Sequence, residues 1–189
     1  APTPAAQAAL RGAAAAGAGG GCAAGEPVPA EGWHRLANAT LWINASAPTL
    51  WSLLTDMPGW AAWNDVFEVQ IDGALAVGER FKLMSYMSTA PLPFLRRTTI
   101  TMEVSVLQEP SKICWMPQSL PGLSGEHCYL LCPEKGGTLV YNYEDQSGLL
   151  QPIMRWIMGR ATSDALDSFN RAMSARALAP FLNGARHLF

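Results

Sequence analysis

The alternating pattern of residues 97–108, RTTITMEVSVLQ, most constrains how this chain folds. Apolar and polar side chains alternate along it, with Ile100, Met102 and Val104 on one side and Thr101 and Glu103 on the other. This period of two is typical of a strand with one buried and one solvated face. Shorter segments show similar patterns: RLANATLWINAS, VFEVQID, ERFKLMSY, KICWMPQ, EHCYLLCP and GTLVYNYEDQ. The pattern predicts an antiparallel sheet with an apolar face that another element has to cover.

One long helix, predicted over about 149–181, is available to cover that face. Its apolar residues recur at steps of three and four, whereas most charged residues lie off this stripe. The stripe consists of Leu150, Ile153, Met154, Ile157, Met158, Ala161, Ala165, Phe169, Ala172 and Met173. Because strands and helices are segregated along the chain, we expect an α+β fold with the helix on the concave face of a curved sheet.

Two short helical segments are predicted between the first and second strands. Ser46 is a candidate N-cap, and Pro48 is placed in the first turn. Pro58-Gly59 ends this segment, and WAAWND forms one more turn, with Trp60 and Trp63 on the same side. Two tryptophans on a short connector indicate that it seals an apolar interior.

Composition narrows the classes of function. The chain has 189 residues, 49% of them apolar, and a formal net charge of −2. This charge gives no basic footprint for nucleic acid. No run of about 18 apolar residues occurs, so no stable membrane insertion is expected.

The four cysteines are predicted to be free thiols. Cys128 and Cys132 lie four residues apart in one predicted strand, about 13 Å apart and too far for a disulfide. The ligand set of a metal site is also incomplete. Free thiols favour a reducing, intracellular location, either cytoplasmic or organellar.

The ends of the chain differ from its middle. Residues 1–32 are rich in Ala and Gly, and are interpreted as a disordered tail or as the remnant of a targeting peptide. Residues 33–182 form the predicted domain, and 183–189 a short C-terminal tail.

Three segments carry a resemblance to a known superfamily. They are INASAPTLWSLLTDMPGWAAWND, the turn GALAVGERF, and GEHCYLLCPEKGGTLVYNYEDQSGLL. Their order and spacing resemble the START-related, birch-pollen-allergen-like superfamily (SRPBCC, polyketide cyclase/dehydrase-like), over about residues 36–180. The resemblance implies a helix-grip fold: a curved seven-stranded antiparallel sheet around a long C-terminal helix, with two short helices closing a hydrophobic cavity. Trp60 and Trp63 would then pin the connector onto the sheet edge.

His127 and Tyr129 are the candidate catalytic residues, because they share one face of a predicted strand. An imidazole and a phenol facing a cavity can orient a carbonyl group or move a proton. The neighbouring strand offers either Asn142 and Glu144 or Tyr141 and Tyr143 to the same side. The predicted ligand-binding residues are Met84, Met102, Val104, Trp115, His127, Tyr129, Leu131, Met154, Ile157, Met158 and Phe169.

The leading hypothesis is a module that binds or transports a hydrophobic small molecule, such as a lipid, a polyketide or another aromatic compound, without a cofactor or a metal. The alternative is a cofactor-independent enzyme, similar to a polyketide cyclase or dehydratase, that uses His127 and Tyr129. A third class, a chaperone-activating interaction domain, is disfavoured because charged residues are few. The sequence leaves the oligomeric state open.

The loop between the third and fourth strands is unusually apolar. Residues 87–95, MSTAPLPFL, precede Arg96 and Arg97. Exposed apolar side chains here would be costly without a partner. The loop is expected either to fold over the cavity or to contact a membrane or a protein.

Overall fold

The computed structural model describes residues 26–118 and 121–185. Seven antiparallel strands form one sheet in the order β1-β7-β6-β5-β4-β3-β2. The strands are β1 (His34–Ile43), β2 (Phe67–Ile71), β3 (Arg80–Tyr86), β4 (Arg97–Gln108), β5 (Lys112–Pro117), β6 (Ser124–Glu134) and β7 (Gly137–Ser147). The α+β helix-grip architecture predicted from the sequence is confirmed.

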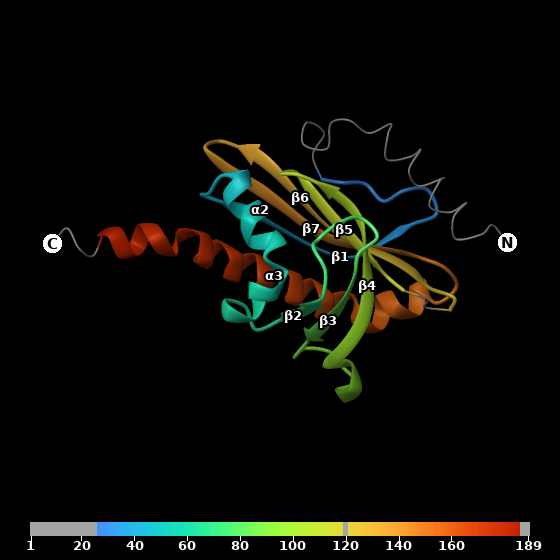
Figure 1. Cartoon of the computed structure of the whole chain (residues 1–189). Helices are drawn as coiled ribbons and strands as arrows, with labels where there is room; N and C mark the ends of the chain where they lie inside the picture. Colours follow the sequence, from blue (N-terminus) through green and yellow to red (C-terminus); the bar gives the residue numbers. More distant parts are fainter. Residues whose placement is uncertain (1–25, 119–120, 186–189) are drawn as a thin grey trace.

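The helices lie on one side of the sheet (Figure 1). They are α2 (Ala47–Thr55), the 3-10 helices η1 (Met57–Ala62) and η2 (Pro93–Leu95), and α3 (Gln151–Ala185). The long helix α3 packs chiefly along β1 and also contacts β7 and α2. It extends three residues into the segment 183–189 that was predicted as a tail. The predicted tail 1–32 is described only from residue 26, where Glu26 accepts hydrogen bonds from Arg35 and Asn38.

The helix α2 begins as its sequence predicts. The Oγ of Ser46 accepts a hydrogen bond from the Thr49 amide at 3.3 Å, and Pro48 lies in the first turn. These features satisfy a free amide group and pre-set the backbone of the first turn. Leu50 and Leu54 are completely buried by this placement, which fixes α2 against the rest of the core.

The main core lies between the sheet and the helices. The inner face of the sheet contributes Ile43, Val104, Ile113, Tyr129, Leu131 and Val140, and α3 contributes Ala165, Leu166, Phe169, Met173 and Ala177. At the start of α3, the buried side of the helix differs from the predicted stripe. Ile153 and Leu150 belong to that stripe, yet they are 54% and 44% exposed. The sheet is covered from about Met158 onward, whereas the first turns of α3 lie partly outside it.

Candidate functional site

Three polar rings lie together on the inner face of β5 and β6. Trp115 is the direct cross-strand partner of His127, and Tyr129 lies two residues further along β6 on the same face. The Trp115 and His127 rings are stacked, with centroids 4.9 Å apart, and the His127 and Tyr129 centroids are 5.2 Å apart. The prediction that His127 and Tyr129 share one face of a strand is therefore correct, and the structure shows that this is the inner face.

We define Trp115, His127 and Tyr129 as the ring cluster, and aromatic side chains of α3 and of the η1 connector pack against it. The ring centroid of Phe169, in α3, lies 5.5 Å from that of Tyr129, and the ring centroid of Trp60 lies 6.0 Å from that of Trp115. Trp60 and Trp63 each contact Phe169 at 4.9 Å. The connector with two tryptophans thus packs against α3 as well as the sheet, whereas the sequence placed it on the sheet edge alone.

Each member of the ring cluster has a buried polar atom without a hydrogen-bond partner. These atoms are Trp115 Nε1, His127 Nε2 and Tyr129 Oη. The residues are only 1%, 7% and 0% exposed. An unsatisfied buried polar group costs about 1–3 kcal/mol. Three such atoms in one cluster are characteristic of a site that offers hydrogen bonds to a bound group.

The inner face of β7 adds Glu144 to this cluster. Glu144 is the cross-strand partner of His127, and its Oε2 lies 3.9 Å from His127 Nδ1. Gln146 donates a hydrogen bond to the other carboxylate oxygen at 2.8 Å. Of the two pairs that β7 could have turned inward, the structure selects Asn142 and Glu144. His127 therefore lies between a second titratable side chain, Glu144, and the Tyr129 ring, as proton-transfer chemistry requires.

Burial determines the protonation state of Tyr129. It raises the pKa of the phenol well above its ordinary value, and the neighbouring Asn142 amide opposes this rise. The phenol is therefore neutral at physiological pH and acts as a hydrogen-bond donor rather than as a base.

A second polar pair in the same interior is bonded to its surroundings. Asn142 donates to Asn170 Oδ1 at 3.0 Å, and Asn170 donates to the Ala39 carbonyl at 3.3 Å. Through these bonds the pair ties α3 to β7 and β1. Only Asn142 Oδ1 lacks a partner. This pair has a structural role, in contrast to the ring cluster.

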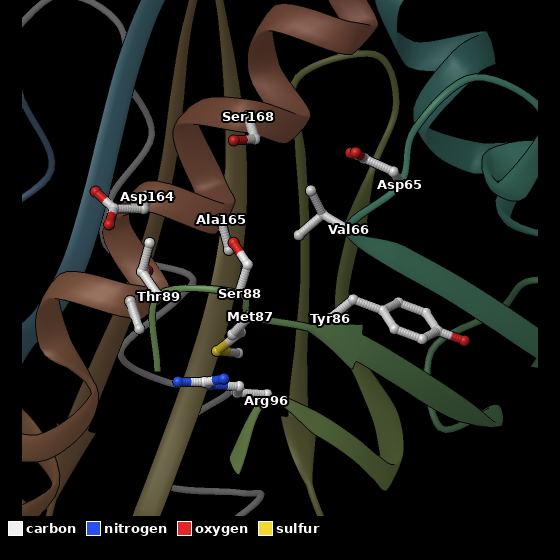
Figure 2. Close-up of a pocket in the computed structure, with 11 residues that line it drawn as sticks. Asp65, Val66, Tyr86, Met87, Ser88, Thr89, Arg96, Asp164, Ala165 and Ser168 are labelled. Atoms are coloured by element: carbon white, nitrogen blue, oxygen red, sulfur yellow. The ribbon is translucent and has the colours of Figure 1, made fainter. Parts of the chain in front are cut away.

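A cleft opens between α3 and the end of β3 (Figure 2). Its volume is about 300 Å³. Apolar side chains on its walls include Val66, Met87, Ala161 and Ala165. Polar side chains surround them: Asp65, Tyr86, Ser88, Thr89, Arg96, Asp164 and Ser168. The sequence analysis did not identify this site. The available signal was the pair of alanines at i and i+4 on the buried side of α3, which leaves space beside the helix.

The predicted ligand-binding residues fall into three places, and none of them lines this cleft. Seven lie on the inner face or against it: Met102, Val104, Trp115, His127, Tyr129, Leu131 and Phe169. Met154, Ile157 and Met158 form a separate cluster at the start of α3, under Ala90 and Leu95 of the β3–β4 loop. The cleft lies between the two groups, because Ala161 belongs to the α3-start cluster and Ala165 to the main core.

Met84 is a correction to the prediction. It alternates with Leu83 and Ser85, which are buried, and pairs with Glu68 and Thr99 on the other face of the sheet. The two-residue period of β3 therefore turns Met84 away from the interior.

The cysteine prediction is also wrong. Cys114 and Cys128 are direct cross-strand partners on the outer face of β5 and β6, and they form a disulfide with a Cα–Cα distance of 4.2 Å. No cysteine of the described residues is free. The spacing in the sequence correctly excludes a disulfide within one strand, between Cys128 and Cys132. It does not reveal which residues of two neighbouring strands lie opposite each other. The intracellular location was inferred from free thiols and loses this support, since disulfides persist in oxidising compartments.

The outer face also holds a group of metal-ligand atoms. Cys114, Cys128 and Glu126 place their ligand atoms within 4.8 Å of one another. Both sulfur atoms are bonded to each other, so they are not thiolate ligands in this structure. Glu126 instead accepts a hydrogen bond from Ser105 at 2.7 Å.

Comparison with known proteins gives structural matches only. No protein-family model and no curated protein matches the sequence. A START superfamily protein from Mycobacterium smegmatis matches 75% of this chain and 95% of its own, with a TM-score of 0.57 and 18% identity. The chain has the START-like helix-grip fold.

Two aromatase/cyclases share this fold with the chain. The Zhui aromatase/cyclase from a Streptomyces species is 13% identical, with a TM-score of 0.54, and the match covers 76% of this chain and 95% of the cyclase. The di-domain ARO/CYC StfQ of the steffimycin biosynthetic pathway is 13% identical, with a TM-score of 0.61, and the match covers 76% of this chain and 50% of StfQ. The resemblance predicted from the sequence is thus confirmed for the fold. Among the described residues, no helix is long and apolar enough to cross a membrane.

Proposed function

We propose that this protein binds a hydrophobic small molecule between the sheet and α3, and that the ring cluster orients the polar group of that molecule. The observation that supports this most directly is the set of three unpaired polar atoms, Trp115 Nε1, His127 Nε2 and Tyr129 Oη. The indole N–H can only donate, whereas the neutral phenol and the imidazole nitrogen can each donate or accept. Such a set matches a ligand hydroxyl or carbonyl oxygen.

Access from the cleft is the second part of this proposal. The apolar walls of the cleft reach Ala165, which is 5% exposed and belongs to the main core. Phe169 lies one helical turn further along and contacts Tyr129. A displacement of the Phe169 ring would connect the cleft with the ring cluster. The cleft volume of about 300 Å³ lies at the lower end of small-molecule sites.

The ligand would gain its affinity from burying apolar surface. Each Å² removed from water contributes about 25 cal/mol before the costs of association. The polar atoms of the ring cluster would contribute less affinity than orientation, because a typical hydrogen bond is worth only about 0.5–1.5 kcal/mol net. We therefore propose a lipid, a polyketide or another aromatic molecule with one terminal oxygen function.

A second candidate function is a cofactor-independent cyclisation or dehydration. The convergence of His127, Tyr129 and Glu144 favours it, because one group can take a proton while another polarises a carbonyl. In that reaction, His127 Nε2 would accept the proton from a carbon next to a ligand carbonyl. The Tyr129 hydroxyl would donate a hydrogen bond to the resulting enolate, and Glu144 would stabilise the protonated imidazole.

The test is a fluorescence titration with anilinonaphthalene sulfonate as an apolar probe. Ser168→Phe at the cleft rim and Ala165→Phe at its wall should each weaken probe binding at least about fivefold, by filling the space. Ala175→Phe, at an exposed position of the same helix, is the matched control and should leave binding unchanged. Equal binding by the folded wild type, Ser168→Phe and Ala175→Phe would contradict a site at the cleft.

A different measurement distinguishes the enzyme function from the carrier function. Incubation with a linear poly-β-ketone substrate analogue should give a cyclised product. The variant His127→Phe should no longer form this product but should still bind the probe. Probe binding without turnover would leave the carrier function as the only one supported.

A further inference from the structure

The first turns of α3 carry an exposed apolar stripe. Leu149, Ile153 and Trp156 are 90%, 54% and 86% exposed. They are spaced by four and three residues, so they lie on one side of the helix and its lead-in turn. This side is opposite to the buried residues Met158, Ala161 and Ala165, which face the sheet. Large apolar residues grouped in this way on a surface indicate a contact site.

The β3–β4 loop adds a second apolar projection next to the same part of α3. Ala90 and Leu95 of this loop pack against Met154, Ile157 and Met158. The adjacent Phe94 is 72% exposed and Leu92 is 38% exposed. We define the α3-start surface by the residues Leu92, Phe94, Leu149, Ile153 and Trp156. The loop thus has an inward and an outward side: Leu95 packs against α3, and Phe94 is exposed.

Charge distinguishes this end of the molecule from the rest. Residues 146–163 contain Arg155 and Arg160 but no Asp or Glu, and residues 86–102, which include the β3–β4 loop, contain Arg96 and Arg97 but no acidic residue. The chain as a whole has a net charge of −2. Four arginines therefore belong to the two segments that carry the exposed apolar residues, while the nearby acids Asp65 and Asp164 line the adjoining cleft. A second copy docked through this surface would place these arginines against each other, which disfavours self-association.

We propose that the α3-start surface binds the surface of an anionic lipid bilayer. A helix side with Trp, Ile and Leu beside arginines is suited to the interface between headgroups and acyl chains, where Trp is favoured. Arginines near the surface gain affinity from anionic lipids. The contact is peripheral, in agreement with the finding that no helix of the described residues could cross a membrane.

The position of this surface links it to the proposed ligand site. Arg96 and Met87 belong to the β3–β4 loop and also line the cleft, and Ala161 belongs both to the cleft and to the α3-start cluster. A protein seated on a bilayer through this surface would hold the cleft near the lipid. The bilayer proposal itself does not require the ligand proposal, because it depends on the exposed stripe and its charge.

The test is co-sedimentation of the full-length protein with vesicles of phosphatidylcholine alone or with about 30% phosphatidylserine. We expect binding to the anionic vesicles, at least about tenfold weaker binding to the neutral ones, and a loss of binding at high salt. Trp156→Glu should reduce binding to anionic vesicles at least about tenfold. Val77→Glu, at a 62% exposed apolar site in the β2–β3 connection, is the matched control and should have little effect.

A pair of charge-reversal variants tests the arginines. Arg155→Glu with Arg160→Glu should reduce vesicle binding at least about tenfold, whereas Arg171→Glu with Arg176→Glu, further along the same helix, should not. Probe binding in the cleft should be unchanged in both. The proposal is overturned if the wild type does not sediment with anionic vesicles, or if both charge-reversal variants lose binding equally. It is also overturned if light scattering shows a wild-type dimer that Trp156→Glu converts to a monomer.

Discussion

Buried polar groups on the outer face of strands β5, β6 and β7 are bonded to partners, whereas several on the inner face are not. On the outer face, Asp145 forms an ion pair with Arg35, and the Arg35 guanidinium stacks over the Tyr143 ring at 4.5 Å. Cys114 and Cys128 of that face are joined in a disulfide. On the inner face, each ring-cluster residue keeps an unpaired polar atom although it is buried to a similar degree.

This difference indicates which face was shaped for stability and which for binding. The same strands supply both faces, so the unpaired atoms are not a consequence of poor packing of the sheet. The Asn142–Asn170 pair shows that the inner face is also able to bond its polar groups where they hold α3. The unpaired atoms of the inner face are those of the ring cluster, with Asn142 Oδ1 and Gln146 Oε1 on the neighbouring strand, and groups of this kind are concentrated at functional sites.

The largest effect is expected for Phe169→Ala, on the inner face. This ring is completely buried and contacts Trp60, Trp63 and Tyr129. Its removal should lower the free energy of unfolding by about 3–5 kcal/mol. Urea denaturation measures this loss. A loss below about 1 kcal/mol would show that the inner cluster does not hold α3 against the sheet.

Removal of the disulfide, on the outer face, should have the next largest effect. The bond joins residues 14 apart, and a loop of this length corresponds to about 3 kcal/mol of stability. Cys114→Ala with Cys128→Ala should therefore unfold at lower urea, while binding of the anilinonaphthalene sulfonate probe changes less than about twofold. A large loss of probe binding by a folded double variant would contradict the separation of the two faces.

Alkaline pH should weaken the fold through the outer-face phenol. Burial, and then the charges of Asp145 and Glu126, raise the pKa of Tyr143 to about 12, although Arg35 opposes the rise. The unfolded chain releases the phenol proton near pH 10. The stabilisation of the fold by the protonated Tyr143 is therefore complete below pH 10 and is lost as the pH rises toward 12. The loss amounts to about 2–3 kcal/mol. Tyr143→Phe should show a smaller decline between pH 9 and pH 11, and an identical decline would refute the assignment.

Tyr129→Phe should have the smallest effect on stability and the most selective effect on function. Because the Tyr129 hydroxyl has only the side chain of its cross-strand neighbour Asn142 beside it and no hydrogen bond of good geometry, its loss should change stability by no more than about 1 kcal/mol. The natural ligand should bind roughly two- to tenfold more weakly, by the loss of one hydrogen bond. Calorimetric unfolding and competition with the bound probe measure the two quantities. A destabilisation above about 2 kcal/mol would mean that the hydroxyl is bonded in the folded protein.

The fold was predictable because its signals are local. Alternation along β4, the Ser46 cap and the three- and four-residue period of α3 each depend on neighbours in the sequence. The same alternation placed His127 with Tyr129 correctly. It misplaced Met84, because the apolar character of a single side chain does not reveal which face its strand turns inward.

Features that depend on register between strands were not predictable. The Cys114–Cys128 bond and the choice of Glu144 as the partner of His127 both follow from cross-strand pairing. The exposed positions of Ile153 and Trp156 depend on where the sheet ends beneath α3. The cleft lies where three separate elements meet, and only its alanines left a signal in the sequence.

Native mass spectrometry of the protein purified from its own cells tests the central claim most directly. We expect one hydrophobic molecule per chain, with a hydroxyl or carbonyl group, and a clearly lower occupancy in His127→Phe with Tyr129→Phe. The account is contradicted if the wild type carries no such molecule, or if the folded double variant retains it at the same occupancy.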